Sequence, residues 1–190
     1  MGWNKFFGGN GPKRPNKQGE RRHIGHRPVR FEQMEQRALL AVAPVDTTDL
    51  GHVDYREVDA AEQTYQLTTR HDGILTADLE GGGNVALYDS GYNPILPAAT
   101  RVDRVVSQGE TYFVTLTGTT TGEDLWLANL VDDATTDLVV HGTTQDDDYD
   151  FDWTVDGGGA IDTYNLRVNS VEYTFAVADV DSIALDTGPG

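Results

Sequence analysis

The sequence predicts an all-β protein: an antiparallel β-sandwich followed by a second small β unit, after a disordered N-terminal tail and a short helix. Three observations lead to this prediction. Residues 1–43 are basic overall, whereas the chain from residue 44 onward is acidic. Short runs rich in Val, Thr, Tyr and Leu recur in this acidic region, and Gly, Asp, Asn or Pro separate them. We therefore expect three parts, at residues 1–43, 44–132 and 133–190.

The basic region comes first and predicts a tail followed by a helix. From Met1 to about Pro28 the chain is mostly Gly, Pro, Asn, Lys and Arg, which bury too little apolar surface to offset the entropy lost on ordering. The apolar side chains that follow are spaced three or four residues apart, on one face of a helix. These are Phe31, Met34, Ala38 and Val42. We expect this helix to end near Pro44.

The first β unit contains six short runs with strand composition. They are residues 64–70, 73–79, 84–89, 104–107, 110–118 and 124–130. In the fifth run, Tyr112, Val114 and Leu116 alternate with threonines and Phe113, so the two sets lie on opposite faces of a strand. The expected core positions of this unit are Tyr65, Leu75, Leu87, Tyr112, Val114, Leu116, Trp126 and Leu127.

The second β unit contains five further runs, at residues 137–142, 149–155, 163–168, 171–177 and 181–186. Asn169 and Ser170 form a two-residue link between the third and fourth of these runs. Because Asn tolerates a positive φ angle, this link predicts a tight hairpin. Gly81 to Gly83 and the segment around Ser90 are expected to form turns between strands of the first unit.

Charge excludes several classes of partner. The 190 residues carry a net charge of -17, but residues 1–37 contribute +6 and the remainder -23, with no lysine after Lys17. A body this acidic repels phosphate backbones and attracts divalent cations, so we expect no nucleic-acid partner. No apolar run approaches the roughly 18 residues of a membrane-spanning helix. The chain has no cysteine, which excludes disulfides and thiolate chemistry.

The densest group of carboxylates could bind calcium, which prefers oxygen ligands. The candidate ligands are Asp146, Asp148, Asp150 and Asp152. Their spacing does not match an EF-hand loop, because position 6 would be Trp153 and no Glu falls at position 12. Strict alternation of Tyr149, Phe151, Trp153 and Val155 with polar residues favours a strand with an acidic solvent face. We therefore expect no resident cofactor beyond weakly bound calcium.

Other motifs give little support for catalysis. The five histidines show no metal-ligand spacing, and Ser90 lacks the GxSxG pattern of a nucleophile elbow. The two Gly-rich segments lack the Lys-Ser/Thr of a phosphate-binding loop. The aromatic residues within the strand-like runs are expected mostly in the core, with a sugar-stacking patch among them as the alternative. They are Tyr65, Tyr88, Tyr112, Phe113, Trp126, Trp153 and Tyr173.

The segment "RFEQMEQRALLAV" resembles the LEPR-XLL type of N-terminal motif found in large exported surface proteins of planctomycetes and other bacteria. The residues that correspond to it are Phe31, Glu32, Glu35, Arg37, Leu39 and Leu40, with Phe31 as a variant. The run Ala41-Val42-Ala43 after a basic tract also resembles the end of a secretory signal. These resemblances imply export, with the export machinery as a partner of the N-terminal region.

Residues 62–130 resemble a bacterial pre-peptidase C-terminal (PPC) domain, a small β-sandwich found in secreted proteins. The residues that carry this likeness are "EQTYQLTTRHDGILTADL", "NVALYDSGYNPIL" and "VSQGETYFVTLTG". Residues 137–188 resemble the opening coil of β-solenoid regions in large surface proteins. These likenesses imply an exported protein that is the head of a larger repeat protein.

The leading hypothesis is therefore a non-catalytic, secreted or cell-surface protein with a structural or adhesive role. Its expected partners are extracellular polysaccharides or other surface proteins. The alternative is a lectin-like module that binds carbohydrate or calcium. A glycosidase built on Asp150 and Asp152 is disfavoured, since neighbours two apart on an exposed strand share one solvated face.

Overall fold

The strands of this chain build two facing sheets and a third, smaller sheet. The computed structural model describes residues 46–61, 63–119, 122–133 and 135–186, all within one compact unit spanning residues 39–190. The predicted tail and helix of residues 1–43, with the six export-motif residues, lie outside the described residues. In the described part there are fourteen strands and one short 3-10 turn, and none of its segments is a helix able to cross a membrane.

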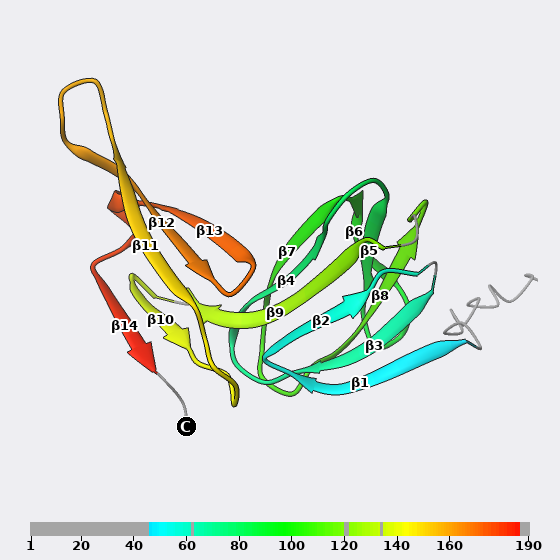
Figure 1. Cartoon of the computed structure of the whole chain (residues 1–190). Helices are drawn as coiled ribbons and strands as arrows, with labels where there is room; N and C mark the ends of the chain where they lie inside the picture. The colour runs from blue at the N-terminus through cyan, green and yellow to red at the C-terminus, as the bar shows by residue number, and fades with distance from the viewer. Residues whose placement is uncertain (1–45, 62, 120–121, 134, 187–190) are drawn as a thin grey trace, which may run out of the picture. The chain divides into compact units, whose positions relative to one another are not determined.

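The two larger sheets form the sandwich (Figure 1). The first has the order β1-β3-β8-β5-β6, and its strands are β1 (Thr47–Val53), β3 (Thr64–Thr69), β8 (Thr111–Thr117), β5 (Asn84–Tyr88) and β6 (Pro94–Ala99). The second has the order β14-β10-β9-β4-β7, and its strands are β14 (Ser182–Asp186), β10 (Asp137–His141), β9 (Asp124–Asp132), β4 (Gly73–Leu79) and β7 (Arg101–Val106). Strand β2 (Tyr55–Asp59) also pairs with β9.

The third sheet is an antiparallel meander of β11 (Tyr149–Val155), β12 (Ile161–Val168) and β13 (Val171–Ala176). Asn169 adopts a φ of 56°, and Val168 pairs with Val171, which confirms the predicted two-residue hairpin. A 3-10 turn, η1 (Val177–Asp179), then leads to β14. The parallel stacking expected of a solenoid coil is not found among β11 to β13.

The sequence boundary at residue 132 falls within a continuous sheet. Strand β9 pairs with β2 through residues 124–128, and with β10 through Val131 and Asp132. Strands β10 and β14, from the expected second unit, therefore extend a sheet of the sandwich. The second unit thus contributes strands to two sheets.

Two strand pairs differ from the antiparallel prediction. Strands β1 and β3 are parallel, and so are β10 and β14. Parallel neighbours need a connection that crosses over before the chain returns in the same direction. Strand β2 supplies this crossover in the first case, and the whole β11–β13 meander supplies it in the second.

Three strands, β1, β2 and β6, were not predicted from the sequence. Polar and charged residues interrupt the first two, and few of their side chains are buried. Strand β6 contains Pro94 and Pro97 and lies at the edge of its sheet. Proline is tolerated in edge strands because one side of such a strand has no neighbour, so the missing N–H can face solvent without loss of a hydrogen bond between strands. Composition alone therefore hides these strands.

The apolar side chains form two buried clusters. Between the facing sheets lie seven of the eight predicted core residues, and only Trp126 is half-buried on the opposite face of β9. The second cluster joins the end of the second sheet to the meander, and its members are Ala128, Leu130, Val131, Leu138, Val140, Leu166, Val168, Val171 and Tyr173. Phe113 is buried on the outer face of β8, as its alternation with Tyr112 and Val114 predicts.

Replacing Leu116 tests the assignment of this core. Its side chain is 2% exposed between the sheets, so Leu116→Ala removes buried methyl groups and leaves a cavity. We expect the free energy of unfolding to fall by about 2 to 5 kcal/mol in urea denaturation. Val105→Ala is the control, because Val105 is 61% exposed on edge strand β7. Equal losses for both variants would contradict the assigned faces.

Candidate interaction surface on the β11–β12 hairpin

The β11–β12 hairpin extends beyond the other described strands (Figure 1). Its two strands pair antiparallel over seven residue pairs, and Asp156 closes its tip by accepting backbone N–H bonds from Gly158 and Ala160. Every residue from 150 to 162 is exposed. The outer half of the hairpin therefore presents both of its faces to solvent, whereas Leu166 and Val168 at the inner end of β12 are buried.

One face of the hairpin is apolar. Phe151, Trp153 and Val155 follow one another at alternate positions of β11, and the side chains of Trp153 and Val155 are 56% and 57% exposed. Their cross-strand partners are Leu166, Tyr164 and Ile161. The rings of Phe151 and Tyr164 stack with centroids 5.6 Å apart. Among the seven aromatic residues, Trp153 thus does not follow the expectation of a mostly buried set.

This apolar face continues the second buried cluster. Leu166 of β12 and Tyr173 of β13, which pair with each other, are buried against the sandwich, whereas Ile161 and Phe151 further along the hairpin are exposed. Apolar side chains thus alternate along the whole of the β11–β13 sheet, but they are buried in the half next to the sandwich and exposed in the half further out. The alternation predicted which residues share the face, but not which of them a second layer covers.

The opposite face of the hairpin is polar and acidic. Asp150 lies across from Arg167, whose Nη2 is 3.6 Å from the Asp150 carboxylate and 3.7 Å from that of Asp148. Asp152 accepts a 2.8 Å hydrogen bond from Asn165 Nδ2. A hollow of about 270 Å³ lies on this face, lined among others by Asp150, Asp152, Arg167 and Glu172.

Two of the four candidate calcium ligands thus lie on this face, and the other two precede β11. Asp146 and Asp148 are exposed in the segment before the strand. In the described part of the chain, no group of three or more His, Asp or Glu side chains is arranged to hold a metal ion. The predicted acidic strand face is present, with Asp150 and Asp152 at alternate positions.

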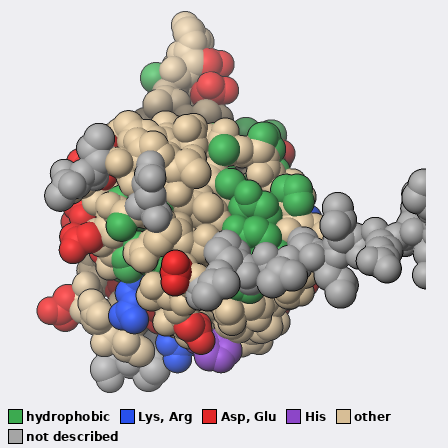
Figure 2. Space-filling view, turned by 90° about the vertical axis from the view of Figure 1, so that its right-hand side faces the viewer, with side chains coloured by type: hydrophobic (Ala, Val, Ile, Leu, Met, Phe, Trp, Pro, Cys, Tyr) green, Lys and Arg blue, Asp and Glu red, His purple; other side chains and the backbone are tan. Residues whose placement is uncertain are grey.

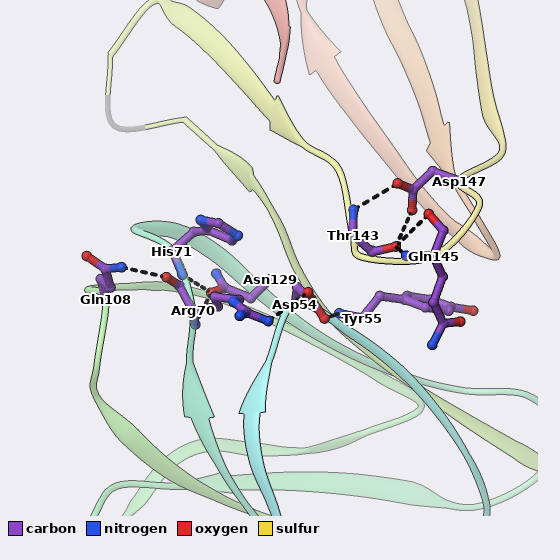
Figure 3. Close-up of polar contacts among 9 residues, drawn as sticks. All are labelled: Asp54, Tyr55, Arg70, His71, Gln108, Asn129, Thr143, Gln145 and Asp147. Atoms are coloured by element: carbon purple, nitrogen blue, oxygen red, sulfur yellow. Dashed lines mark hydrogen bonds and ion pairs between the residues drawn. The ribbon is translucent and has the colours of Figure 1, made fainter. Parts of the chain in front are cut away.

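The neighbouring Asp147 has a structural role instead. Its carboxylate accepts hydrogen bonds from the N–H and hydroxyl of Thr143, each at 2.8 Å (Figure 3). It also accepts a hydrogen bond from Asn169 Nδ2 at 3.2 Å. Asn169 Oδ1 in turn accepts the Asp148 N–H. These bonds hold the segment before β11 against the β12–β13 hairpin and so set where β11 begins.

A second polar region lies where the turn after β3 meets the end of β10. Asn129 of β9 is completely buried there, and its Oδ1 accepts the backbone N–H groups of Arg70 and His71 at 2.9 and 2.7 Å (Figure 3). Its Nδ2 donates to the Ile74 carbonyl. A buried amide with three such bonds fixes the position of this turn, and hence of His71.

The rings of His71 and His141 stack in a hollow of about 290 Å³. Their centroids are 4.0 Å apart and the ring planes differ by 5°. Parallel rings place their nitrogen lone pairs in parallel planes, so the pair is poorly arranged to share one metal ion. The charged groups around it are Asp54, Arg70 and Asp186. Sequence spacing did not reveal this pair, since the two histidines are 70 positions apart in different strands or turns.

The pKa of His71 lies below its usual value of 6.5. Burial of the ring is the largest cause, and the neighbouring His141 and Arg70 lower it further, whereas Asp54 and Asp186 oppose the change. Burial disfavours the charged imidazolium because the ring loses part of its hydration. At neutral pH His71 is therefore uncharged.

Comparisons with known proteins identify no family. No protein family and no curated protein matches the sequence. Among solved structures, the chain is similar to the pre-peptidase C-terminal domain of a collagenase from Bacillus anthracis, with a TM-score of 0.31 and 9% sequence identity. The match covers 46% of this chain and 97% of that domain.

The lowered pKa of His71 predicts a loss of stability in weak acid. A histidine with a lower pKa in the folded state contributes stability that is present above the unfolded pKa of about 6.5 and is lost as the pH falls through its folded pKa. We expect the free energy of unfolding to drop less between pH 7 and pH 5 in His71→Gln than in the unaltered protein, as measured by urea denaturation.

His52→Gln provides the control for this experiment, because His52 is exposed on β1. Its pH dependence should follow that of the unaltered protein. A His71→Gln variant with an unchanged pH dependence would contradict the assignment.

Proposed function

We propose that this chain is a non-catalytic, secreted or cell-surface protein with a structural or adhesive role. The observation that carries the proposal is the exposed apolar face of the β11–β12 hairpin, formed by Phe151, Trp153, Val155 and Ile161. Contiguous exposed apolar patches of several hundred Å² on soluble proteins are often interaction sites. A hairpin that holds such a patch away from the other strands can reach a partner.

The acidic body supports the same reading. In Figure 2 acidic side chains lie on the left and lower parts of the visible face and apolar side chains gather on its right, with few Lys or Arg. The projection at its top carries both apolar and acidic side chains. A strong net charge keeps a protein soluble and prevents non-specific association. An apolar contact surface can be presented on such a body without general aggregation.

A lectin-like role is the second candidate function, and the exposure of Trp153 favours it. Aromatic rings on an open strand can stack on the apolar faces of sugar rings, and Tyr164 adds a hydroxyl on the same face. A glycan array with the unaltered protein and Trp153→Thr tests this role. Signals lost in the variant would support it, and a flat response with and without calcium would remove it.

We do not propose catalysis. Asp150 and Asp152 lie on one exposed strand face in contact with Arg167 and Asn165. Water solvates both carboxylates, so their surroundings do not separate an acid from a base, as a glycosidase requires.

Export is proposed to depend on the N-terminal region, where Glu32, Arg37 and Leu40 belong to the LEPR-XLL-like segment. We expect fractionation of the native organism to find the protein outside the cytoplasm, and its intact mass to place the mature N-terminus after residue 37, most simply at Ala43. An intact, uncleaved chain confined to the cytoplasm would contradict the proposal.

Calcium is proposed to bind weakly and diffusely. The acidic body attracts divalent ions, but Asp150 lies beside Arg167, and Asp152 is bonded to Asn165. We expect calorimetry to show dissociation constants on the order of 1 mM without fixed stoichiometry. A one-to-one micromolar isotherm that disappears on replacing Asp146, Asp148, Asp150 and Asp152 with Asn would instead establish a defined site.

A further inference from the structure

Strand β11 has one free edge. In the described residues it pairs with β12 on one side and with no strand on the other. Alternate N–H and C=O groups of a strand point to each side, so about half of those in β11 are directed away from β12. Exposed groups of this kind can form a ladder with another extended chain.

The side chains of β11 define what kind of strand would fit this edge. Phe151, Trp153 and Val155 point to one face, and Asp150 and Asp152 to the other. Directly opposed side chains of neighbouring strands lie about 4.5 to 5.5 Å apart and interact. An added strand with apolar residues beside the first set and Lys or Arg beside the second would complement both faces.

A second copy of this chain would not match the edge. Two antiparallel β11 strands would bring the Asp150 and Asp152 carboxylates of both copies together, and each body is strongly acidic. The four most exposed apolar side chains of the hairpin offer on the order of 400 Å². A stable protein interface needs about 800 Å² from each partner. The face is therefore too small, and its edge too acidic, for a stable homodimer.

We propose that β11 binds an extended segment of a partner protein by strand addition, and that this segment alternates apolar and basic residues. The proposal rests on the proposed adhesive function and names the class of partner. Backbone bonds along the free edge supply affinity, and the side chains supply selectivity. Arg167 lines the hollow on the polar face together with Asp150, Asp152 and Glu172. A basic side chain of the segment would therefore lie beside Asp152, whose partner Asn165 is neutral.

The polar face of the hairpin keeps a net negative charge, which attracts a basic segment. Arg167 lies near both Asp148 and Asp150 and offsets part of their charge, whereas Asp152 has a neutral partner in Asn165. Glu172 pairs across from Arg167 on β13 and adds a further carboxylate. Acidic side chains on an edge strand also discourage pairing with like-charged strands, which restricts the edge to basic partners.

The test uses the full chain and a synthetic peptide of repeated Lys-Val-Arg-Val units, with calorimetry at low salt. We expect one-to-one binding with a dissociation constant on the order of 10 to 100 µM. A peptide with Glu in place of Lys and Arg should not bind. Scrambling the order of the same residues should weaken binding, because apolar and basic side chains would no longer be on separate faces.

Backbone methylation distinguishes strand addition from simple charge attraction. Two peptides are N-methylated at alternate positions, one set on each edge of the strand. The set that faces β11 should lose binding and the other should retain it, since a methylated nitrogen cannot donate a hydrogen bond. Equal binding by both methylated peptides would overturn the proposal.

Variants of the protein locate the site. Asp150→Asn with Asp152→Asn should weaken binding roughly fivefold at low salt. Trp153→Thr should weaken it also, while circular dichroism confirms the fold. The matched control is Glu57→Gln with Glu80→Gln, which removes the same charge from exposed residues of the sandwich. Equal loss in the control pair would show non-specific attraction and overturn the proposal.

The same experiments also show whether a second copy of the chain or a polysaccharide, instead of a peptide, binds to the β11–β12 hairpin. Concentration-dependent dimerisation that depends on Trp153, without peptide binding, would assign the face to a second copy. Displacement of the peptide by a neutral polysaccharide, or binding of that polysaccharide alone, would assign it to sugar. Both results would overturn strand addition. Peptide binding by a protein found in the cytoplasm would retain the binding site and remove only the proposed location.

Discussion

Strand β9 is the constraint on which the other elements depend, because it is buried on both faces. Leu125 and Leu127 pack between the sandwich sheets, while Ala128 and Leu130 pack in the second cluster under the meander. One edge of β9 pairs with β4, and β2 and β10 share the other. Its nearly continuous apolar sequence is typical of a strand covered on both sides. The meander therefore packs on the sandwich through β9, and β9 also contributes to the core of the sandwich.

A buried polar side chain specifies the geometry at the far end of this strand. The pairing of β4 with β9 shifts between Ile74 and Thr76, next to Asn129. Such a bulge redirects side chains and leaves local backbone groups to be satisfied. Asn129 supplies the acceptor for two of these groups in the turn after β3 and donates to the Ile74 carbonyl. An apolar residue there would remove the acceptor of these two part-buried N–H groups and so weaken the attachment of the turn.

The sequence predicted those features that depend on local patterns. The alternation of Tyr112, Val114 and Leu116 located a core face, and Asn169 located a hairpin, because side-chain direction and turn conformation are set by neighbouring residues. Strand β6, which begins at Pro94, was missed because an edge position, which only the assembled sheet defines, makes proline acceptable. In the candidate surface, the sequence grouped Phe151 with Trp153 correctly, but its expectation that the aromatic residues lie mostly in the core does not hold for Trp153. Whether a second layer covers a face depends on how the sheets pack, and the alternation of residues along one strand does not reveal this.

The two faces of the hairpin have related consequences for solubility and recognition. An exposed strand edge with an apolar face is an aggregation hazard, and its hazard falls when charges lie on the edge strand. Asp150 and Asp152 provide such charges on the strand that presents Phe151 and Trp153. The same carboxylates that repel another acidic chain attract a basic one, so in the proposed strand addition one pair of residues would both limit self-association and select the partner. The apolar side chains then contribute burial, which the charges alone would not supply, and the alternation of β11 keeps these two contributions on separate faces of one strand.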